Sequence, residues 1–165
     1  MMTQSDFSAQ PTATPKGGRF FISVEKTPIF SYNFLMQKNF DQWNERKKKL
    51  NDHADRVFFH EREVWWCALG VNIGFEMDGK SKEYSRPVIV LKKYNHYSFL
   101  ALPLSTSKTT NKYRIPVGPI SGKEAAANLS QVRNIDSKRL IKKIGRIELD
   151  KFEEIKKRTS QINFS

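Results

Sequence analysis

The sequence predicts an α+β, mainly β fold: a small SH3-like barrel or strongly bent antiparallel sheet, with a C-terminal helix and an N-terminal helical extension. Several short apolar runs separated by turn residues follow residue 63, which is typical of a small barrel. Stretches with the helical spacing of apolar residues lie before and after these runs. A chain of 165 residues has room for one such domain and an appendage.

The N-terminal part divides into two segments by composition. Residues 1–18 are rich in Ser, Thr, Gln, Pro and Gly, so we expect a disordered tail there. They lack the basic start and apolar segment of a signal peptide. Residues 19–58 are predicted to form an N-terminal extension, with an apolar run at 19–24 that is long enough for a strand and a helix at 34–52.

The predicted helix at 34–52 is amphipathic. The basic run at 46–49 points largely away from its apolar face. We therefore expect the helix to pack on the barrel by that face, in preference to binding a membrane or RNA. The face consists of Met36, Phe40, Trp43 and Leu50.

From residue 63 onward the pattern predicts strands. The first strong candidate is the apolar run at 64–69, and the second is the run at 86–91. Pro87 fits a strand start or edge because it cannot donate to a ladder. A third run at 97–104 is joined to the second by a short turn around Asn95. Weaker strands are predicted at 112–117, 129–135 and 143–147.

Two helical pieces are predicted near the C-terminal end. Asp136 caps a single turn at 136–140. A terminal helix runs from residue 150 to about residue 158, with Asp150 and Glu153 as its capping box.

Three neighbours in the first strand have structural roles. Trp65 and Trp66 face opposite sides, so we expect one in the core and the other against a dimer partner or the N-terminal helix. Cys67 is the single cysteine and fits a small buried side chain. A disulfide framework is excluded, which suits a cytoplasmic protein.

The positive charge is concentrated in one part of the chain. Lys and Arg total 29 against 17 acids, for a net charge of +12. Between residues 80 and 146 there are 15 basic and three acidic residues, which account for the whole excess. Such a stretch is either a solvated surface or, as we favour, a face that binds a polyanion and releases its counterions. No apolar run reaches membrane-spanning length.

The common catalytic motifs are missing from the sequence. His53, His60 and His96 are scattered, and no metal-ligand spacing, phosphate-binding glycine motif or serine-hydrolase elbow occurs. We therefore expect no metal and no cofactor. RNA offers another route because its 2′-hydroxyl is an internal nucleophile. Arg, Ser or Thr, and one carboxylate can supply the proton transfers and charge stabilisation that this reaction needs.

A series of short motifs follows the first predicted strand in a fixed order. The motifs are Glu63–Gly70, Asn72–Glu76, Arg86–Val90, Leu102–Thr106, Leu129–Asp136, Lys138–Leu140 and Lys143–Arg146. Each motif is weak alone, but their order and spacing together resemble the MazF/PemK family of toxins specifically. The resemblance covers about residues 59–158, so residues 59–165 are expected to form a MazF/PemK-like domain of the MazF/CcdB fold type, and the first 58 residues lie outside the family core.

The resemblance implies the toxin of a type II toxin–antitoxin system. Such a protein is a metal-independent, sequence-selective endoribonuclease that cuts single-stranded RNA, mainly mRNA, by attack of the 2′-hydroxyl. It works as a homodimer with RNA in a groove across the two-fold axis. The acidic tail of its cognate antitoxin occupies the same groove, and DNA is contacted only through the antitoxin.

The family pattern also implies the catalytic residues. Arg86 matches the arginine at the scissile phosphate, with an ion pair to an acid as the alternative role. Ser105 stands where most members have the catalytic threonine, followed by Thr106, so either hydroxyl is a candidate. Glu76 matches a loop glutamate implicated in some members, or else pairs with Arg86 or Lys80.

Other matched positions are expected to bind RNA. Gln131 and Arg133 match strand positions that line the RNA groove, although Arg133 has Asp136 as an alternative partner. Ser130 stands where some members carry an acid. The remaining RNA-binding candidates are Asn72, Lys108 and Thr109, and the aromatic side chains available for base stacking are Phe75, Tyr84 and Tyr113.

The sequence is compatible with two other functions. The first is a gyrase-poisoning toxin of the same fold, related to CcdB, which would not need Arg86 or the hydroxyls of Ser105 and Thr106. The second is an RNA-binding relative that does not cleave, which the serine at position 105 leaves open.

Overall fold

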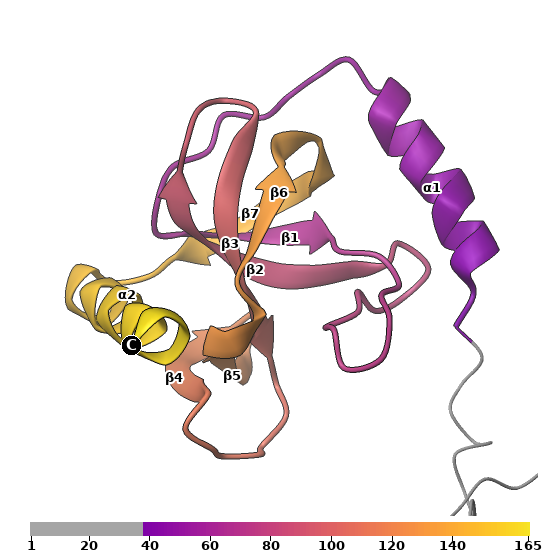
Figure 1. Cartoon of the computed structure of the whole chain (residues 1–165). Helices are drawn as coiled ribbons and strands as arrows, with labels where there is room; N and C mark the ends of the chain where they lie inside the picture. The colour runs from indigo at the N-terminus through magenta and orange to yellow at the C-terminus, as the bar shows by residue number, and fades with distance from the viewer. Residues whose placement is uncertain (1–37) are drawn as a thin grey trace, which may run out of the picture. The chain divides into compact units, whose positions relative to one another are not determined.

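The computed structural model describes residues 38–165. The expected tail at 1–18, the apolar run at 19–24 and Met36 therefore lie outside the described residues. Figure 1 shows a bent sheet with one helix beside each of two ends. In chain order the elements are α1 (Phe40–Asp52), β1 (Glu63–Ala68), β2 (Ser85–Lys93), β3 (Ser98–Ser105), β4 (Arg114–Ile120), β5 (Lys123–Asn128), the short 3₁₀ helix η2 (Leu129–Gln131), β6 (Arg133–Asp136), the short 3₁₀ helix η3 (Ser137–Arg139), β7 (Leu140–Arg146) and α2 (Leu149–Phe164).

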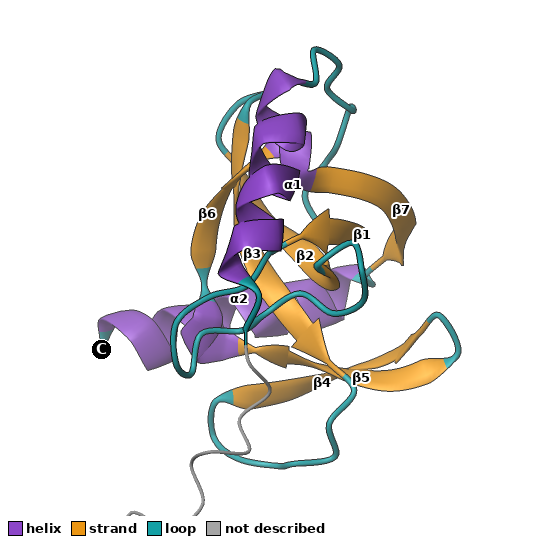
Figure 2. Cartoon of the chain, turned by 90° about the vertical axis from the view of Figure 1, so that its right-hand side faces the viewer, coloured by secondary structure: helices purple, strands orange, loops and turns teal. Residues whose placement is uncertain are grey.

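The seven strands form one antiparallel sheet that curls into a partial barrel, as predicted. The strand order is β4-β5-β3-β2-β1-β7, and β6 also pairs with β3. Along one edge, β3 therefore pairs with β6 through residues 98–101 and with β5 through residues 104–105. This division bends the sheet, and it carries the β4–β5 hairpin away from the other strands (Figure 2).

Both faces of the central strands are buried, which explains their continuous apolar runs. Val88 and Val90 pack in a cluster with Phe99, whereas Ile89 and Leu91 pack on the opposite face. Trp65 belongs to the first cluster, as expected for one of the two neighbouring tryptophans. Helix α2 covers the second cluster, to which it contributes Phe152 and Ile155.

Several predicted elements differ from the observed ones at their ends. The predicted strand at 129–135 is wrong in its first half, because residues 129–131 form η2 and β6 starts at Arg133. Strand β5 was not predicted. The capping box is also wrong: α2 starts at Leu149, its cap residue Glu148 makes no side-chain capping bond, and the helix continues to Phe164. The cap at Asp136 is confirmed, since its carboxylate accepts from the backbone N–H of Lys138 at 2.8 Å.

Helix α1 packs on the β domain, as predicted, but through fewer apolar side chains than expected. Trp43 is buried, Leu50 is half-buried, and Phe40 is largely exposed. Asn39 caps the helix by accepting from the N–H of Gln42 at 2.8 Å. No helix in the described part of the chain has the length and apolar character needed to cross a membrane.

Candidate catalytic pocket

Arg86, Ser105 and Thr106 line one hollow at the end of the sheet. The antiparallel register pairs Val88 of β2 with Pro103 of β3, so Arg86 and Ser105, each two residues beyond this pair, come to the same end of the two strands. The hollow has a volume of about 360 Å³. Its lining consists of Trp66, Lys80, Ser85, Arg86, Pro87, Leu104, Ser105, Thr106, Ile120, Ser121, Lys123 and Ala125.

Arg86 is held by two main-chain carbonyl groups. Its Nε donates to the carbonyl oxygen of Asp78 at 2.6 Å, and its Nη1 donates to that of Leu104 at 3.0 Å. Only 8% of the residue is exposed. Within residues 38–165 it forms no direct ion pair, so the alternative role as the partner of an acid is not observed. Its Nη2 makes no hydrogen bond to the described residues, so this group is free to bind a ligand.

Burial changes the electrostatics of Arg86. Removal from water lowers the pKa of its guanidinium, the nearby Asp78 carboxylate raises it, and Arg114 lowers it further. An arginine stays protonated at neutral pH despite such shifts. The hollow therefore contains a fixed, poorly hydrated positive charge, which suits a phosphate group.

Two lysines add to this charge and were not predicted as site residues. Lys80 enters from the loop between β1 and β2, and Lys123 enters at the start of β5. Lys123 follows a tight turn in which Ser121 and Gly122 both have positive φ, which positions it over the hollow. Among the described lining residues there is no carboxylate and no imidazole.

Both hydroxyl groups at the end of β3 reach the hollow. Ser105 is half-buried, and its Oγ accepts from the N–H of Ser107 at 3.2 Å, which leaves its proton free to donate. Thr106 is exposed at the first position after the strand. Trp66 lines the same hollow, so this second tryptophan lies beside Arg86. One of the two expectations for it, packing against the N-terminal helix, is therefore wrong.

Glu76 lies in a different hollow. It is exposed, and it lines a depression together with Ser130, Gln131, Val132 and Arg133. In the described part of the chain it forms no ion pair with Lys80 or Arg86. The structure thus separates Glu76 from the other three predicted catalytic residues.

Arg133 is available to a ligand. Its expected alternative partner, Asp136, instead binds Arg56 at 2.7 Å. Burial alone would raise the pKa of Asp136, but the contacts with Arg56 and with the Lys138 N–H together outweigh it and lower the pKa. The idea that Arg133 pairs with Asp136 is therefore wrong. Sequence spacing suggested the near partner, whereas the fold supplies one from 80 residues away.

Gln131 and Asn72 hold the β1–β2 loop, which we define as residues 69–84. The Gln131 Oε1 accepts from the N–H of Met77 at 3.1 Å, and its Nε2 donates to the carbonyl of Phe75 at 3.4 Å. The Asn72 Nδ2 donates to the carbonyl of Met77 at 2.9 Å. In this structure the side chains of both predicted RNA-binding residues contact protein, and Phe75 at the loop tip is almost fully exposed.

Lys108 and Thr109 lie in the exposed loop between β3 and β4. Arg114 braces this loop by donating to the carbonyls of Ser107 at 3.1 Å and Thr109 at 2.8 Å. The Lys108 side chain is exposed, close in sequence to the hydroxyls that line the Arg86 hollow.

Among residues 38–165 no three His, Cys, Asp or Glu side chains gather as metal ligands would. Cys67 is fully buried, and burial raises the pKa of its thiol to about 12, so it is not a nucleophile at neutral pH.

Comparison with known proteins gives a family match and similar folds. Residues 60–162 match the family model described as a PemK-like, MazF-like toxin of type II toxin–antitoxin systems. The crystal structure of MazF from Deinococcus radiodurans is 17% identical, with a TM-score of 0.55 over 64% of this chain and 96% of that one. An endoribonuclease from a Mycobacterial species, solved with its cognate antitoxin, is 12% identical, with a TM-score of 0.49 over 66% and 98%. No curated protein sequence matches significantly.

Proposed function

Because the chain belongs to the PemK-like, MazF-like toxin family of type II toxin–antitoxin systems, we propose that it is a sequence-selective endoribonuclease that cuts single-stranded RNA without a metal ion. One observation carries the proposal: the hollow at the end of β2 and β3 combines the Arg86 guanidinium with the hydroxyls of Ser105 and Thr106. A gyrase poison of this fold has no need for that combination.

The proposed reaction is an internal phosphoryl transfer. The 2′-oxygen of a ribose forms a bond to the adjacent phosphorus, and the bond from phosphorus to the 5′-oxygen breaks. The 2′-hydroxyl loses its proton, the 5′-oxygen gains one, and the products are a 2′,3′-cyclic phosphate and a 5′-hydroxyl. No water molecule and no redox partner is needed.

The residues in the hollow stabilise the charge that develops on phosphorus. Arg86 presents Nη2 to a non-bridging oxygen, and its two carbonyl contacts fix it before the substrate arrives. A hydroxyl of Ser105 or Thr106 donates to the same phosphate. Lys80 and Lys123 extend the positive field to the flanking phosphates.

The second hollow, lined by Glu76, Gln131 and Arg133, is proposed to bind a nucleotide next to the cleavage point. There Arg133 would contact phosphate or a base edge, and Glu76 would accept from a base. Lys108 and Thr109 in the exposed β3–β4 loop, and Asn72, are proposed to add contacts that select the sequence.

The first test is product analysis. A single-stranded RNA should be cut in the presence of EDTA, with a 2′,3′-cyclic phosphate and a 5′-hydroxyl at the new ends. Products with a 5′-phosphate, or activity lost on chelation, would contradict the mechanism.

The second test concerns Arg86. Arg86→Ala should lower the single-turnover cleavage rate by about 10²-fold or more, roughly the loss of one preorganised donor, with a far smaller change in RNA affinity. Lys92→Ala is the matched control, because Lys92 is an exposed cation at the other end of β2 and, within residues 38–165, forms an ion pair only with Glu61. Ser105→Ala and Thr106→Ala then identify the hydroxyl that acts.

Assembly and regulation follow from the same positive field. We propose a homodimer whose basic groove binds either RNA or the acidic tail of a cognate antitoxin, since both ligands need the same charge. Antitoxin peptide and RNA should compete, and both affinities should fall steeply with salt. Light scattering that shows a monomer for the full chain would contradict the dimer.

A further inference from the structure

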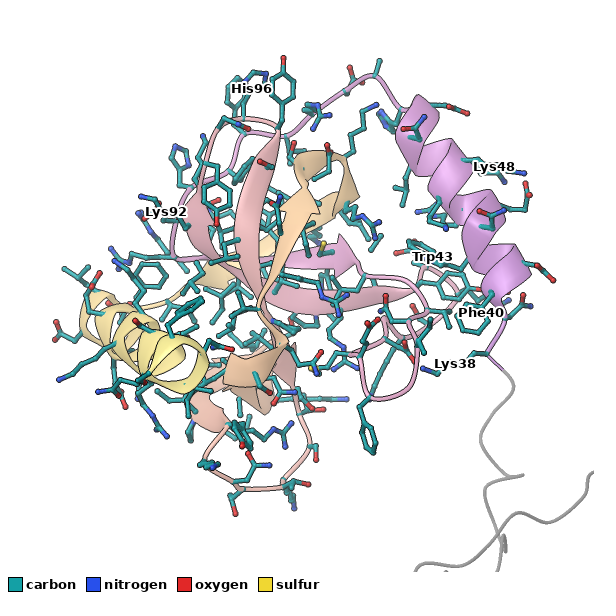
Figure 3. The ribbon with its side chains drawn as sticks, viewed as in Figure 1. Lys38, Phe40, Trp43, Lys48, Lys92 and His96 are labelled. Atoms are coloured by element: carbon teal, nitrogen blue, oxygen red, sulfur yellow. The ribbon has the colours of Figure 1, made fainter. Side chains whose placement is uncertain are left out.

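The β1–β2 loop, which supplies one of the two contacts of Arg86, is held from two sides. On one side, Gln131 binds the loop through Phe75 and Met77. On the other side lies the N-terminal extension, with Lys38 and α1 (Figure 3). The first side belongs to the family domain that matches at residues 60–162, whereas the second lies outside it.

Lys38 binds the loop at three points. Its Nζ donates to the carbonyl of Asn72 at 2.6 Å, lies 2.9 Å from the Asp78 carboxylate, and reaches the carbonyl of Gly74 at 3.4 Å. The side chains of Lys38 and Asp78 are only 29% and 31% exposed, so this ion pair is less screened than one on an open surface. In the described residues Asp78 has no other ion-pair partner.

Helix α1 also fixes the base of the loop. The Trp43 ring lies on Gly70 and contacts the Tyr84 ring at a centroid distance of 5.5 Å. The Tyr84 hydroxyl donates to the Gln42 side chain at 2.6 Å. Gly70 and Tyr84 are joined by a backbone hydrogen bond of 3.0 Å, so α1 covers the point where the loop closes.

Asp78 connects these contacts to the catalytic pocket. Its carboxylate binds Lys38 with one oxygen and accepts from the N–H of Asn72 at 2.6 Å with the other. Its main-chain carbonyl accepts from Nε of Arg86 at 2.6 Å. The residue that Lys38 holds is therefore the same residue that orients the guanidinium.

We propose that Lys38 is a positioning residue for RNA cleavage: by holding Asp78, it keeps the guanidinium of Arg86 directed into the catalytic hollow. The inference rests on the proposed function and assigns a role to the extension. Without Lys38, the Asp78 carboxylate loses its direct ion-pair partner, and among the described residues the tip of the loop is then held from the Gln131 side. The Nε contact of Arg86 then fluctuates, and a small displacement of a catalytic group is costly.

The test is a set of single-turnover cleavage rates. Lys38→Met keeps the length of the side chain without its charge and should lower the rate about tenfold, with the RNA dissociation constant changed less than twofold. Lys38→Arg should restore most of the rate, because a guanidinium can reach the same acceptors. Lys48→Met is the matched control: Lys48 lies on the solvent side of α1 (Figure 3), and among the residues that the structure describes it forms an ion pair only with Glu45.

A double mutant separates positioning from simple destabilisation. If Lys38 acts through Arg86, Lys38→Met should have no further effect on the slow residual rate of Arg86→Ala. A second tenfold loss in that background would overturn the inference. Hydrogen exchange adds a readout that needs no activity: the Asn72 amide, which donates to Asp78, should exchange faster in Lys38→Met, and unchanged exchange would also overturn it.

The failure of this inference differs from the failure of the proposed function. A wild-type protein that cuts no RNA overturns the proposed function and the inference built on it. An active wild type with an equally active Lys38→Met variant overturns the role of Lys38 alone.

Discussion

Helices α1 and α2 have similar sequence patterns, but they pack against different parts of the protein. Both are amphipathic and carry exposed ion pairs three residues apart. Helix α2 buries Phe152, Ile155 and Thr159, two of them in the main apolar cluster, whereas α1 buries only Trp43. The second helix is therefore part of the core, and the first is a brace on the loop beside the catalytic pocket.

The difference shows that a periodic apolar pattern predicts a helix without predicting its depth of burial. Core burial stabilises the whole fold, while a few polar contacts to one loop stabilise that loop. Substitutions in the two helices should thus separate effects on folding from effects on the site.

The largest expected effect is on α2. Ile155→Ala removes a fully buried side chain from the main cluster and should lower the free energy of unfolding by about 2–5 kcal/mol. Urea denaturation followed by circular dichroism measures it. A loss below about 1 kcal/mol would mean that α2 is not part of the cooperative core.

The next effect concerns a buried polar contact of the barrel, at Glu63. Its carboxylate accepts from Trp65 Nε1 at 2.9 Å and the His60 N–H at 3.0 Å, and binds Lys143 at 2.6 Å. Burial alone would raise the pKa of Glu63, but these contacts outweigh it and lower the pKa below its ordinary value. Glu63→Gln should cost about 1–3 kcal/mol at pH 7, as for a buried network that loses one partner.

The pH dependence tests the same contact. A lowered pKa in the folded state means that Glu63 contributes stability above the ordinary glutamate pKa and loses it as the pH falls through the lowered value. The difference in unfolding free energy between wild type and Glu63→Gln should therefore shrink below about pH 4. A constant difference down to pH 2 would contradict the assignment.

A smaller effect on folding is expected for α1. Trp43→Ala should lower the free energy of global unfolding by about 1 kcal/mol or less, because the barrel can stay folded while α1 detaches. Amide exchange at Gly70 and Gly79, which lie at the base of the loop, should accelerate clearly. A loss as large as that of Ile155→Ala would remove the distinction between the two helices.

The smallest effects are expected on the solvent faces, where the helices are alike. Glu45→Gln in α1 and Glu153→Gln in α2 each remove an exposed ion pair, with Lys48 and Lys156. Neither should move the urea midpoint measurably. If only one substitution lowers the urea midpoint, the ion pair that it removes stabilises tertiary structure in spite of its exposure.

Most of the fold was predictable because β1, β2 and β3 have strong local patterns. Strand β5 was missed because Lys123–Asn128 contains three alanines, which have little preference for strands. Its structure depends on tertiary context: Ala127 is fully buried against β3, and the Ser121–Gly122 turn pairs β5 with β4. Local sequence carries no direct information on such packing.

The site was predictable to the extent that it follows strand register. Arg86 and Ser105 come together because β2 and β3 are adjacent antiparallel strands. Lys123 was missed as a site residue together with β5. The contact of Arg86 with Asp78, and of Asp78 with Lys38, depends on the path of an irregular loop, which no periodicity encodes.

The packing of Trp43 on Gly70 limits how parts of this protein can be exchanged with relatives. A Cβ atom at position 70 would lie 2.1 Å from the indole ring, and the φ of +88° independently disfavours any side chain there. A chimera that joins this extension to another MazF-like barrel therefore requires glycine at the matching position. The extension and the barrel are therefore not interchangeable modules, because the Trp43 indole ring occupies the space that a side chain at position 70 would need.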